Sequence, residues 1–164
     1  MPELHPAAPE DAALCGKIRA LYEEVFPKRE RVPFGALTNP RHYELLEITE
    51  AGAFCGFAAC RRRPGLSSLV YFAIDPALRS RGIGGEALEL ILKHLAGNPV
   101  FIDIEDPEES CEDQPLRQRR CRFYLRHGFE STDIVETWQG VHYRILTRDG
   151  HPSRAEIERF WVSE

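Results

Sequence analysis

A strand with no polar face, followed by a glycine-rich turn and a helix, constrains this 164-residue chain more than any other feature. Residues 66–74 (LSSLVYFAI) are apolar on both faces from Leu69 onward, which is typical of a central strand covered on both sides. Residues 84–95 then carry apolar side chains at helical spacing, and residues 100–104 form a second short apolar run. This strand–helix–strand order predicts a parallel pair with a right-handed crossover.

Hairpins and further helices are expected around that unit. The first predicted element is a helix that begins at acidic residues and ends before Pro27, followed by a loop to Pro40 with at most a short helical turn. Hairpin strands are predicted at 43–49 and 54–60, with a turn at 61–65 after them. A helix is predicted at 116–127, and a second pair of hairpin strands at 129–138 and 141–147. Ser153 and Glu156 have the spacing of a capping box. We therefore predict one domain over residues 1–164, with a C-terminal helix at about 153–162. Its class is mixed α/β (α+β by some schemes), a mostly antiparallel central sheet with one parallel pair, flanked by helices.

Charge and cysteine content exclude several classes of partner. Lys and Arg number 21 against 26 Asp and Glu, a net charge of −5, so the dominant basic face of a nucleic-acid-binding protein is not expected. The five cysteines form no Cys-x-x-Cys pair and no zinc-finger spacing, which predicts reduced thiols and no metal. The N-terminus has no signal-peptide pattern, and no apolar run approaches the roughly 20 residues that span a bilayer. A cytoplasmic protein without a membrane partner is expected.

The turn after the central strand, Arg79-Ser80-Arg81-Gly82-Ile83-Gly84-Gly85, has the composition of an anion site. Its glycines let the backbone approach a ligand, the following helix directs its first N–H groups at the turn, and the two arginines suit phosphate. The spacing fits neither G-x-G-x-x-G nor a Walker loop. From composition alone, a purely steric strand–helix connection remains an equal alternative.

Two segments carry a family resemblance. Arg79-Ser80-Arg81-Gly82-Ile83-Gly84 resembles the R/Q-x-x-G-x-G/A motif of the GCN5-related N-acetyltransferases, the GNAT superfamily. The stretch 123–129 (FYLRHGF) resembles the F-Y-x-x-x-G-F segment of the same family. Their order and separation are those of the family, and the resemblance covers nearly the whole chain, leaving only the helix after Gly150 outside the common core.

The resemblance implies an acetyl-CoA-dependent N-acetyltransferase acting on a primary amine of a small molecule or peptide. It implies a CoA pyrophosphate cradle formed by Arg79, Ser80, Arg81, Gly82, Ile83, Gly84 and Gly85, and pantetheine contacts along Phe72 to Ile74. Tyr124 lies where many members have the acid that protonates the departing thiolate, although a packing role for this ring is the alternative.

The general base is the open question. Some relatives use a glutamate where this chain has Ser68, which is a poor base. Glu105, together with Asp103 on the same strand face, is the best substitute, although both are equally well explained as solvated strand-end acids. Glu47 is a third candidate, and a water-mediated route is a fourth.

Other features leave alternatives open. The acidic run at 105–113 is expected to be a mobile surface loop, and nearby arginines are expected to neutralise it or to reach a CoA phosphate; they are Arg117, Arg119, Arg120 and Arg122. The loss of the usual glutamate permits a non-catalytic acyl-CoA-binding or regulatory module, and the acyl pocket could accept a longer chain. The acceptor is not defined by the sequence, and either a monomer or a homodimer is expected.

Overall fold

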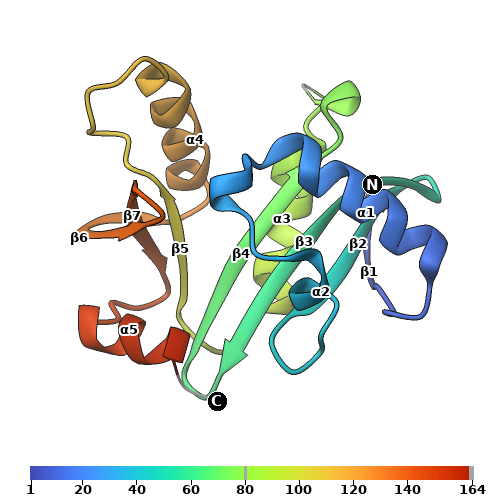
Figure 1. The fold of residues 1–164 in the computed structure, drawn as a ribbon, viewed down its shortest axis with the longest axis horizontal. Coiled ribbons are helices and arrows are strands. Elements are labelled where there is room, and N and C mark those ends of the chain that lie inside the picture. The colour runs from blue at the N-terminus through green and yellow to red at the C-terminus, as the bar shows by residue number, and fades with distance from the viewer. Residues whose placement is uncertain (80, 163–164) are drawn as a thin grey trace. The chain divides into compact units, whose positions relative to one another are not determined.

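The computed structural model describes residues 1–79 and 81–162, and it forms a seven-stranded mixed sheet in the order β1-β2-β3-β4-β5-β7-β6 (Figure 1). The strands are β1 (Pro2–Pro6), β2 (Glu44–Glu50), β3 (Ala53–Arg63), β4 (Leu66–Ile74), β5 (Val100–Glu105), β6 (Glu130–Trp138) and β7 (Val141–Arg148). The helices are α1 (Ala12–Val25), α2 (Phe34–Leu37), α3 (Ile83–His94), α4 (Gln114–Arg126) and α5 (Arg154–Val162), with 3-10 turns at Lys28–Glu30 and Pro76–Leu78. The predicted mixed α/β class is confirmed.

The chain divides into two compact units, each described here by itself. The first contains residues 1–62 and 69–94, and the second contains residues 63–68 and residues from 95 to the C-terminus. No helix within residues 1–79 and 81–162 is long and apolar enough to cross a membrane.

In the first unit, helices cover both faces of the strands. Figure 1 shows α1 and α2 in front of the strands and α3 behind them. The buried side chains of α1, Ile18, Leu21 and Tyr22, join one apolar cluster with Phe57 of β3 and Tyr71 of β4. The Tyr22 and Tyr71 rings meet edge to face with centroids 4.9 Å apart, so an aromatic layer fixes α1 against the central strand.

The ends of α1 follow the predicted signals. Asp11 accepts a hydrogen bond from the Leu14 N–H at 3.1 Å as N-cap, and the helix ends at Val25 before Pro27. The sequence did not indicate β1, which pairs antiparallel with β2 from Pro2↔Glu50 to Pro6↔Leu46. Its two terminal prolines are tolerated because β1 is an edge strand, and so short a strand leaves no clear periodic pattern.

The second unit contains the parallel pair and the closing hairpin. Ser67 pairs with Val100 and Ser68 with Phe101, which confirms the predicted parallel arrangement of β4 and β5. Antiparallel pairing then joins β5 to β7 and β7 to β6. Helix α5 buries Ile157 and Phe160 against Phe101.

The capping box of α5 is confirmed in both directions. The Glu156 N–H donates to Ser153 Oγ, and the Ser153 N–H donates to Glu156 Oε1, each at 3.2 Å. Most boundaries differ by one or two residues from the sequence prediction, and one differs by three. Strand β3 continues to Arg63, so the predicted five-residue turn at 61–65 shortens to Pro64 and Gly65, because paired extended backbone accommodates the arginines.

Candidate active site

The predicted cradle begins where the chain leaves β4 for α3, within the first unit. Gly82 has φ of +77°, a left-handed conformation that disfavours any residue with a Cβ, and nothing lies within 4 Å of the position that a Cβ would take. The 12-residue helix α3 starts at the next residue, Ile83. Glycine is therefore needed here for backbone conformation, and the open space above it leaves the first amides of α3 approachable.

The remaining cradle residues are placed as follows. Arg79 and Arg81 are exposed, Gly84 and Gly85 lie partly buried in the first turn of α3, and Ile83 is buried beneath that turn. Ser80 lies outside the described residues. Exposed guanidinium groups beside free helix amides are the groups that bind phosphate oxygens, so the described part of the turn has the chemistry of an anion site.

A close approach of β3 holds the end of β4 that leads into this turn. A Cβ on Gly56 would lie 2.3 Å from the Ala73 carbonyl oxygen, so only glycine fits there. The Asp75 N–H donates to the Cys55 carbonyl at 2.8 Å, and the Asp75 carboxylate caps Ala77. Sequence analysis did not single out Gly56; its signal was a glycine inside a strand, which often marks close backbone approach.

The central strand continues past its recorded pairing with β5. Within the described residues, its parallel ladder with β5 stops at Ser68 and Phe101, although β4 continues to Ile74. Backbone N–H and C=O groups without a strand partner can pair with an extended ligand. Phe72 is partly buried and Ile74 is buried on this stretch, which was predicted to contact pantetheine.

Tyr124 lies on α4 in the second unit, within an aromatic cluster. Its ring contacts those of Phe123 and Phe129 at centroid distances of 5.2 and 5.6 Å. Burial raises the pKa of Tyr124 to about 12, while Arg120 acts to lower it and Asp103 to raise it. The phenol is therefore neutral and holds its proton across the working pH range.

Asp103 is the carboxyl group that interacts electrostatically with the Tyr124 phenol. It lies partly buried on β5, and burial, with a smaller contribution from Glu136 on β6, raises its pKa to about 6. Burial likewise raises the pKa of Glu136, which sequence analysis had not selected because nothing in β6 separates it from an ordinary edge-strand acid. A carboxyl group that titrates near pH 6 suits proton transfer close to neutrality.

The structure gives Glu105 a different environment. It is buried, its Oε1 accepts from Arg120 Nη1 at 3.2 Å, and its Oε2 lies 3.1 Å from Arg117 Nη2, at ion-pair distance but without hydrogen-bond geometry. Both oxygens therefore face guanidinium groups. These contacts link Glu105 on β5 to helix α4.

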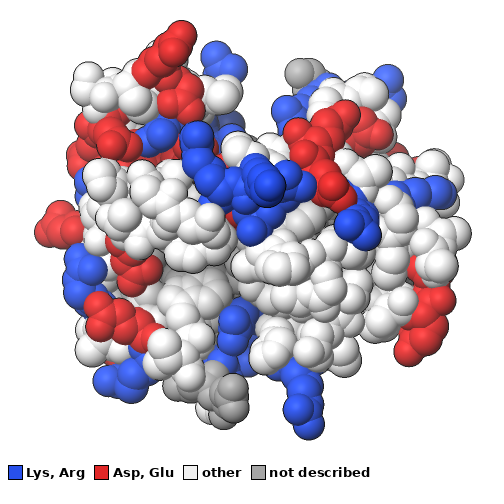
Figure 2. Space-filling model, in the orientation of Figure 1, with Lys and Arg blue, Asp and Glu red and all other residues white. Residues whose placement is uncertain are grey.

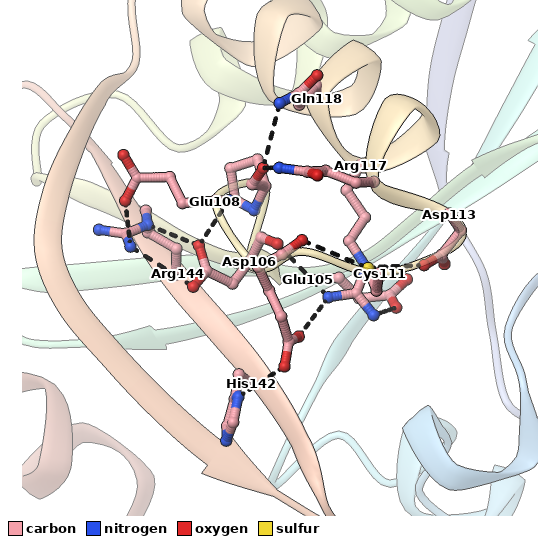
Figure 3. A network of polar contacts seen from close by, with 12 residues as sticks. Glu105, Asp106, Glu108, Cys111, Asp113, Arg117, Gln118, His142 and Arg144 are labelled. Atoms are coloured by element: carbon pink, nitrogen blue, oxygen red, sulfur yellow. Dashed lines mark hydrogen bonds and ion pairs between the residues drawn. The ribbon is translucent and has the colours of Figure 1, made fainter.

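The acidic run after β5 is part of an ion-pair network (Figure 3). Arg117, buried on α4, also contacts Glu109 and Asp113, and Arg144 of β7 holds Asp106 at 2.9 Å. Burial opposes ionisation of Asp106, but the hydrogen bond from Arg144 brings its pKa below the usual value. The segment expected to be a mobile surface loop is thus anchored to α4 and β7, because its charges meet the buried Arg117 and the partly buried Arg144.

Neutralisation of the acidic run is confirmed for Arg117 and Arg120. Arg119 and Arg122 are exposed on α4 and make no ion pair that is recorded within the described residues. Arg144, which sequence analysis missed, contributes from a distant strand, and only the tertiary fold reveals it. Figure 2 shows acidic and basic side chains interspersed over the face in view.

The serine at the usual glutamate position and the third base candidate, Glu47, belong to different units. Ser68 is fully buried on β4 in the second unit, and its hydroxyl has no hydrogen-bond partner within the described residues. Glu47 lies on β2 in the first unit, partly buried and opposite Phe57. Within the described residues, no group of three or more His, Cys, Asp or Glu side chains could hold a metal ion.

Comparison with known proteins identifies the family. A family model described as an acetyltransferase (GNAT) domain matches residues 41–131, more than half of the chain. The chain belongs to the GNAT acetyltransferase family. A comparison with curated proteins gave no match.

Solved GNAT structures share the fold over nearly the whole chain. One from Bacteroides thetaiotaomicron, described as a GNAT-family acetyltransferase, has 21% identity and a TM-score of 0.79, with 95% of this chain and 92% of that chain covered. The ribosomal-protein-S18-alanine N-acetyltransferase of Escherichia coli has 15% identity, a TM-score of 0.65, and coverage of 94% and 97%. Arabidopsis thaliana Naa50, in complex with the bisubstrate analogue CoA-Ac-MVNAL, has 16% identity, a TM-score of 0.67, and coverage of 91% and 99%.

The family assignment makes this GNAT protein an acetyl-CoA-dependent acetyltransferase. The matched range includes the turn around Gly82 and the helix that carries Tyr124. At these identities the solved structures support the fold, and the roles of single residues have to be argued from this chain's own geometry.

Proposed function

We propose that this GNAT protein transfers the acetyl group of acetyl-CoA to a primary amine of a small molecule or peptide, by direct attack. The observation that supports the proposal is a pair of interacting titratable side chains in one unit: Tyr124, neutral with a pKa of about 12, and Asp103, with a pKa of about 6. Environments that push the pKa values of two neighbouring groups apart mark an acid–base pair.

The residues around the turn fit a CoA molecule. Arg79, Arg81 and the backbone amides of 82–85 would hold the pyrophosphate, and Ser80 of the predicted cradle lies outside the described residues. The stretch of β4 up to Ile74, beyond its recorded pairing with β5 within the described residues, would hold the pantetheine arm. When bound, acetyl-CoA supplies a thioester carbonyl that an uncharged amine can attack.

Asp103 is proposed as the base in preference to Glu105. An amine must lose a proton to become a nucleophile, and Asp103 can accept that proton near neutral pH because burial has weakened it as an acid. Glu105, held by Arg117 and Arg120, keeps α4 and its Tyr124 in place. Tyr124 then donates its phenolic proton to the leaving sulfur.

Peptide amines are the first acceptors to test. The names of two structural neighbours refer to an alanine of a ribosomal protein and to an analogue containing the peptide MVNAL. These names apply to those proteins, but they support including peptide N-termini beside small amines in an acceptor screen.

The experiment combines calorimetric titration of acetyl-CoA with detection of free thiol in the presence of each amine. Binding together with amine-dependent thiol release supports transfer. Binding without release from any amine would favour the second candidate, a non-catalytic acyl-CoA-binding module, which the serine at position 68 suggests. Absence of binding would contradict both. Acetyl-CoA and longer acyl-CoA donors, compared with one acceptor, would define the acyl pocket.

A further inference from the structure

A buried hydroxyl and a partly buried carboxyl group, those of Ser68 and Asp103, lie on one face of the second unit, where the recorded pairing of β4 and β5 stops. Leu66 and Phe101 belong to one apolar cluster and therefore point to the same side of the sheet. Side chains two residues apart on a strand share a face, so Ser68 points to the side of Leu66 and Asp103 to the side of Phe101. Ser68 and Asp103 therefore face the same side of the parallel pair.

The register sets how far apart they lie. Ser68 is opposite Phe101, and Asp103 is two residues further along β5. Adjacent strands are separated by about 4.8 Å, and residues two apart on a strand by about 6.6 Å, so the Cα–Cα diagonal is about 8 Å. Two short side chains and one water molecule can bridge that distance.

The Ser68 hydroxyl needs a partner. Its side chain is 0% exposed, and its Oγ has no hydrogen-bond partner within the described residues. A buried hydroxyl without a partner costs free energy, and buried water commonly satisfies such groups where several polar atoms converge. Here the carboxylate of Asp103 and the backbone groups beyond the last paired residues offer further contacts for a water molecule.

We propose that Ser68 is a positioning residue for Asp103, and that its hydroxyl holds one buried water molecule which donates a hydrogen bond to the Asp103 carboxylate. The link stabilises the ionised carboxylate and orients it. Its catalytic consequence rests on the proposed function, because it sets the pH below which Asp103 no longer accepts the amine proton. The link itself does not depend on turnover.

Other charged groups near Asp103 would be unchanged by a substitution at Ser68. Glu136 on β6 acts to raise the Asp103 pKa, and Tyr124 on α4 interacts electrostatically with Asp103. Glu105, two residues further along β5, is held by its arginines. A change that follows Ser68 alone therefore reports the proposed link.

Ser67 provides a matched control. It directly precedes Ser68 on β4, so its side chain points to the face opposite to Ser68 and Asp103. It is 0% exposed, and its hydroxyl also lacks a partner within the described residues. Ser67→Ala thus removes an equally buried hydroxyl from the other face of the same strand.

The test is a carbon-13 NMR titration of the aspartate carboxyl groups in the whole protein, with the Asp103 signal assigned by its loss in Asp103→Asn. The wild-type signal should titrate at about pH 6. Ser68→Ala should move that midpoint up by about 0.5 to 1 pH unit, because a donor to the ionised form is lost. Ser68→Thr, which keeps a hydroxyl, and Ser67→Ala should both titrate like the wild type.

Coincident curves for Ser68→Ala and the wild type would overturn the link, as would an equal shift in Ser67→Ala. Urea unfolding of each variant verifies that it is folded. If the wild-type protein acetylates amines, the acidic limb of kcat/KM should move with the Asp103 midpoint. If it acetylates none, the proposed function fails, and the titration still decides whether Ser68 and Asp103 are linked.

Discussion

Tyr124 is the residue whose replacement separates chemistry from binding. Tyr124→Phe removes only the hydroxyl and keeps the ring contacts with Phe123 and Phe129. We expect kcat for amine acetylation to fall about 100-fold or more, as for loss of a general acid, with little change in the dissociation constant of acetyl-CoA. Steady-state thiol release and calorimetry measure the two quantities. Unchanged kcat would assign Tyr124 a packing role.

The pH dependence of the reaction should report Asp103. A base works only when it is ionised, so kcat/KM should fall as the pH drops through about 6, and no alkaline loss from Tyr124 is expected below about pH 11, since its pKa is about 12. Asp103→Asn should abolish the acidic limb together with most of the activity. An acidic limb that persists at the same pH in Glu105→Gln supports Asp103, and one that persists in Asp103→Asn contradicts it.

Ionised Asp103 should also lower the free energy of unfolding of the protein. Its folded-state pKa of about 6 lies above the unfolded value, so ionisation opposes folding above about pH 6, and the penalty disappears below about pH 4. Asp103→Asn should therefore raise the free energy of unfolding by about 1–3 kcal/mol near pH 7 and leave it nearly unchanged near pH 4. Urea unfolding at the two pH values measures this. A variant less stable than wild type near pH 7 would contradict the desolvated environment assigned to Asp103.

At the level of elements, the left-handed turn before α3 is the feature that CoA binding depends on. Gly82→Ala places a Cβ on a residue with φ of +77°, which strains the turn and shifts the amides of α3. We expect acetyl-CoA binding to weaken about tenfold or more, measured by calorimetry.

Gly65→Ala is the control for this substitution. Gly65 also has a left-handed φ, +85°, with nothing within 4 Å of its Cβ position, but it lies in the β3–β4 turn. Similar strain there should lower stability by about 1 kcal/mol without changing acetyl-CoA affinity. Equal losses of affinity in both variants would mean that strain alone, and not the cradle, explains the Gly82 result.

The buried arginine of α4 should carry much of the stability of the segment after β5. Arg117 is 8% exposed and faces Glu105, Glu109 and Asp113. Arg117→Met leaves the buried Glu105 with only the exposed Arg120, and we expect a loss of about 3 kcal/mol in urea unfolding. Arg119→Met, on the exposed side of the same helix, should change stability by less than about 0.5 kcal/mol. Similar losses in the two variants would contradict the role of the network.

The helices and strands that could be predicted are those marked by signals within a few neighbouring residues. Helix α1, the parallel pair and the α5 capping box follow from caps, prolines and periodicity, which act over a few residues. Strand β1 escaped prediction because five residues bounded by two prolines show no period.

The site was less predictable for the same reason. The predicted role of Gly82 came from the resemblance to the R/Q-x-x-G-x-G/A motif, and its left-handed φ is compatible with that prediction. The arginines that form ion pairs with Glu105 come from helix α4, and the pKa of Asp103 depends on burial by several elements. Neither environment is therefore encoded in neighbouring residues. The prediction that residues 1–164 act as one domain stays a prediction.

For the whole molecule, a ligand that binds only the folded state should stabilise it. Acetyl-CoA at 100 times its dissociation constant should add about 2.7 kcal/mol to the free energy of unfolding, which thermal denaturation measures as a rise in Tm. The same acetyl-CoA concentration, 100 times the wild-type dissociation constant, should raise the Tm of Gly82→Ala by less. It should raise the Tm of Gly65→Ala as much as that of the wild type.

Amine-dependent release of thiol from acetyl-CoA, followed by mass spectrometry of the amine, tests the central claim most directly. The account predicts that at least one small or peptide amine gains an acetyl group on nitrogen at the rate of thiol release, and that Tyr124→Phe and Asp103→Asn lose this activity while still binding acetyl-CoA. Full turnover in both variants would contradict the assigned acid and base. Tight binding of acetyl-CoA by the wild type with no acetylated amine would contradict the transfer reaction itself.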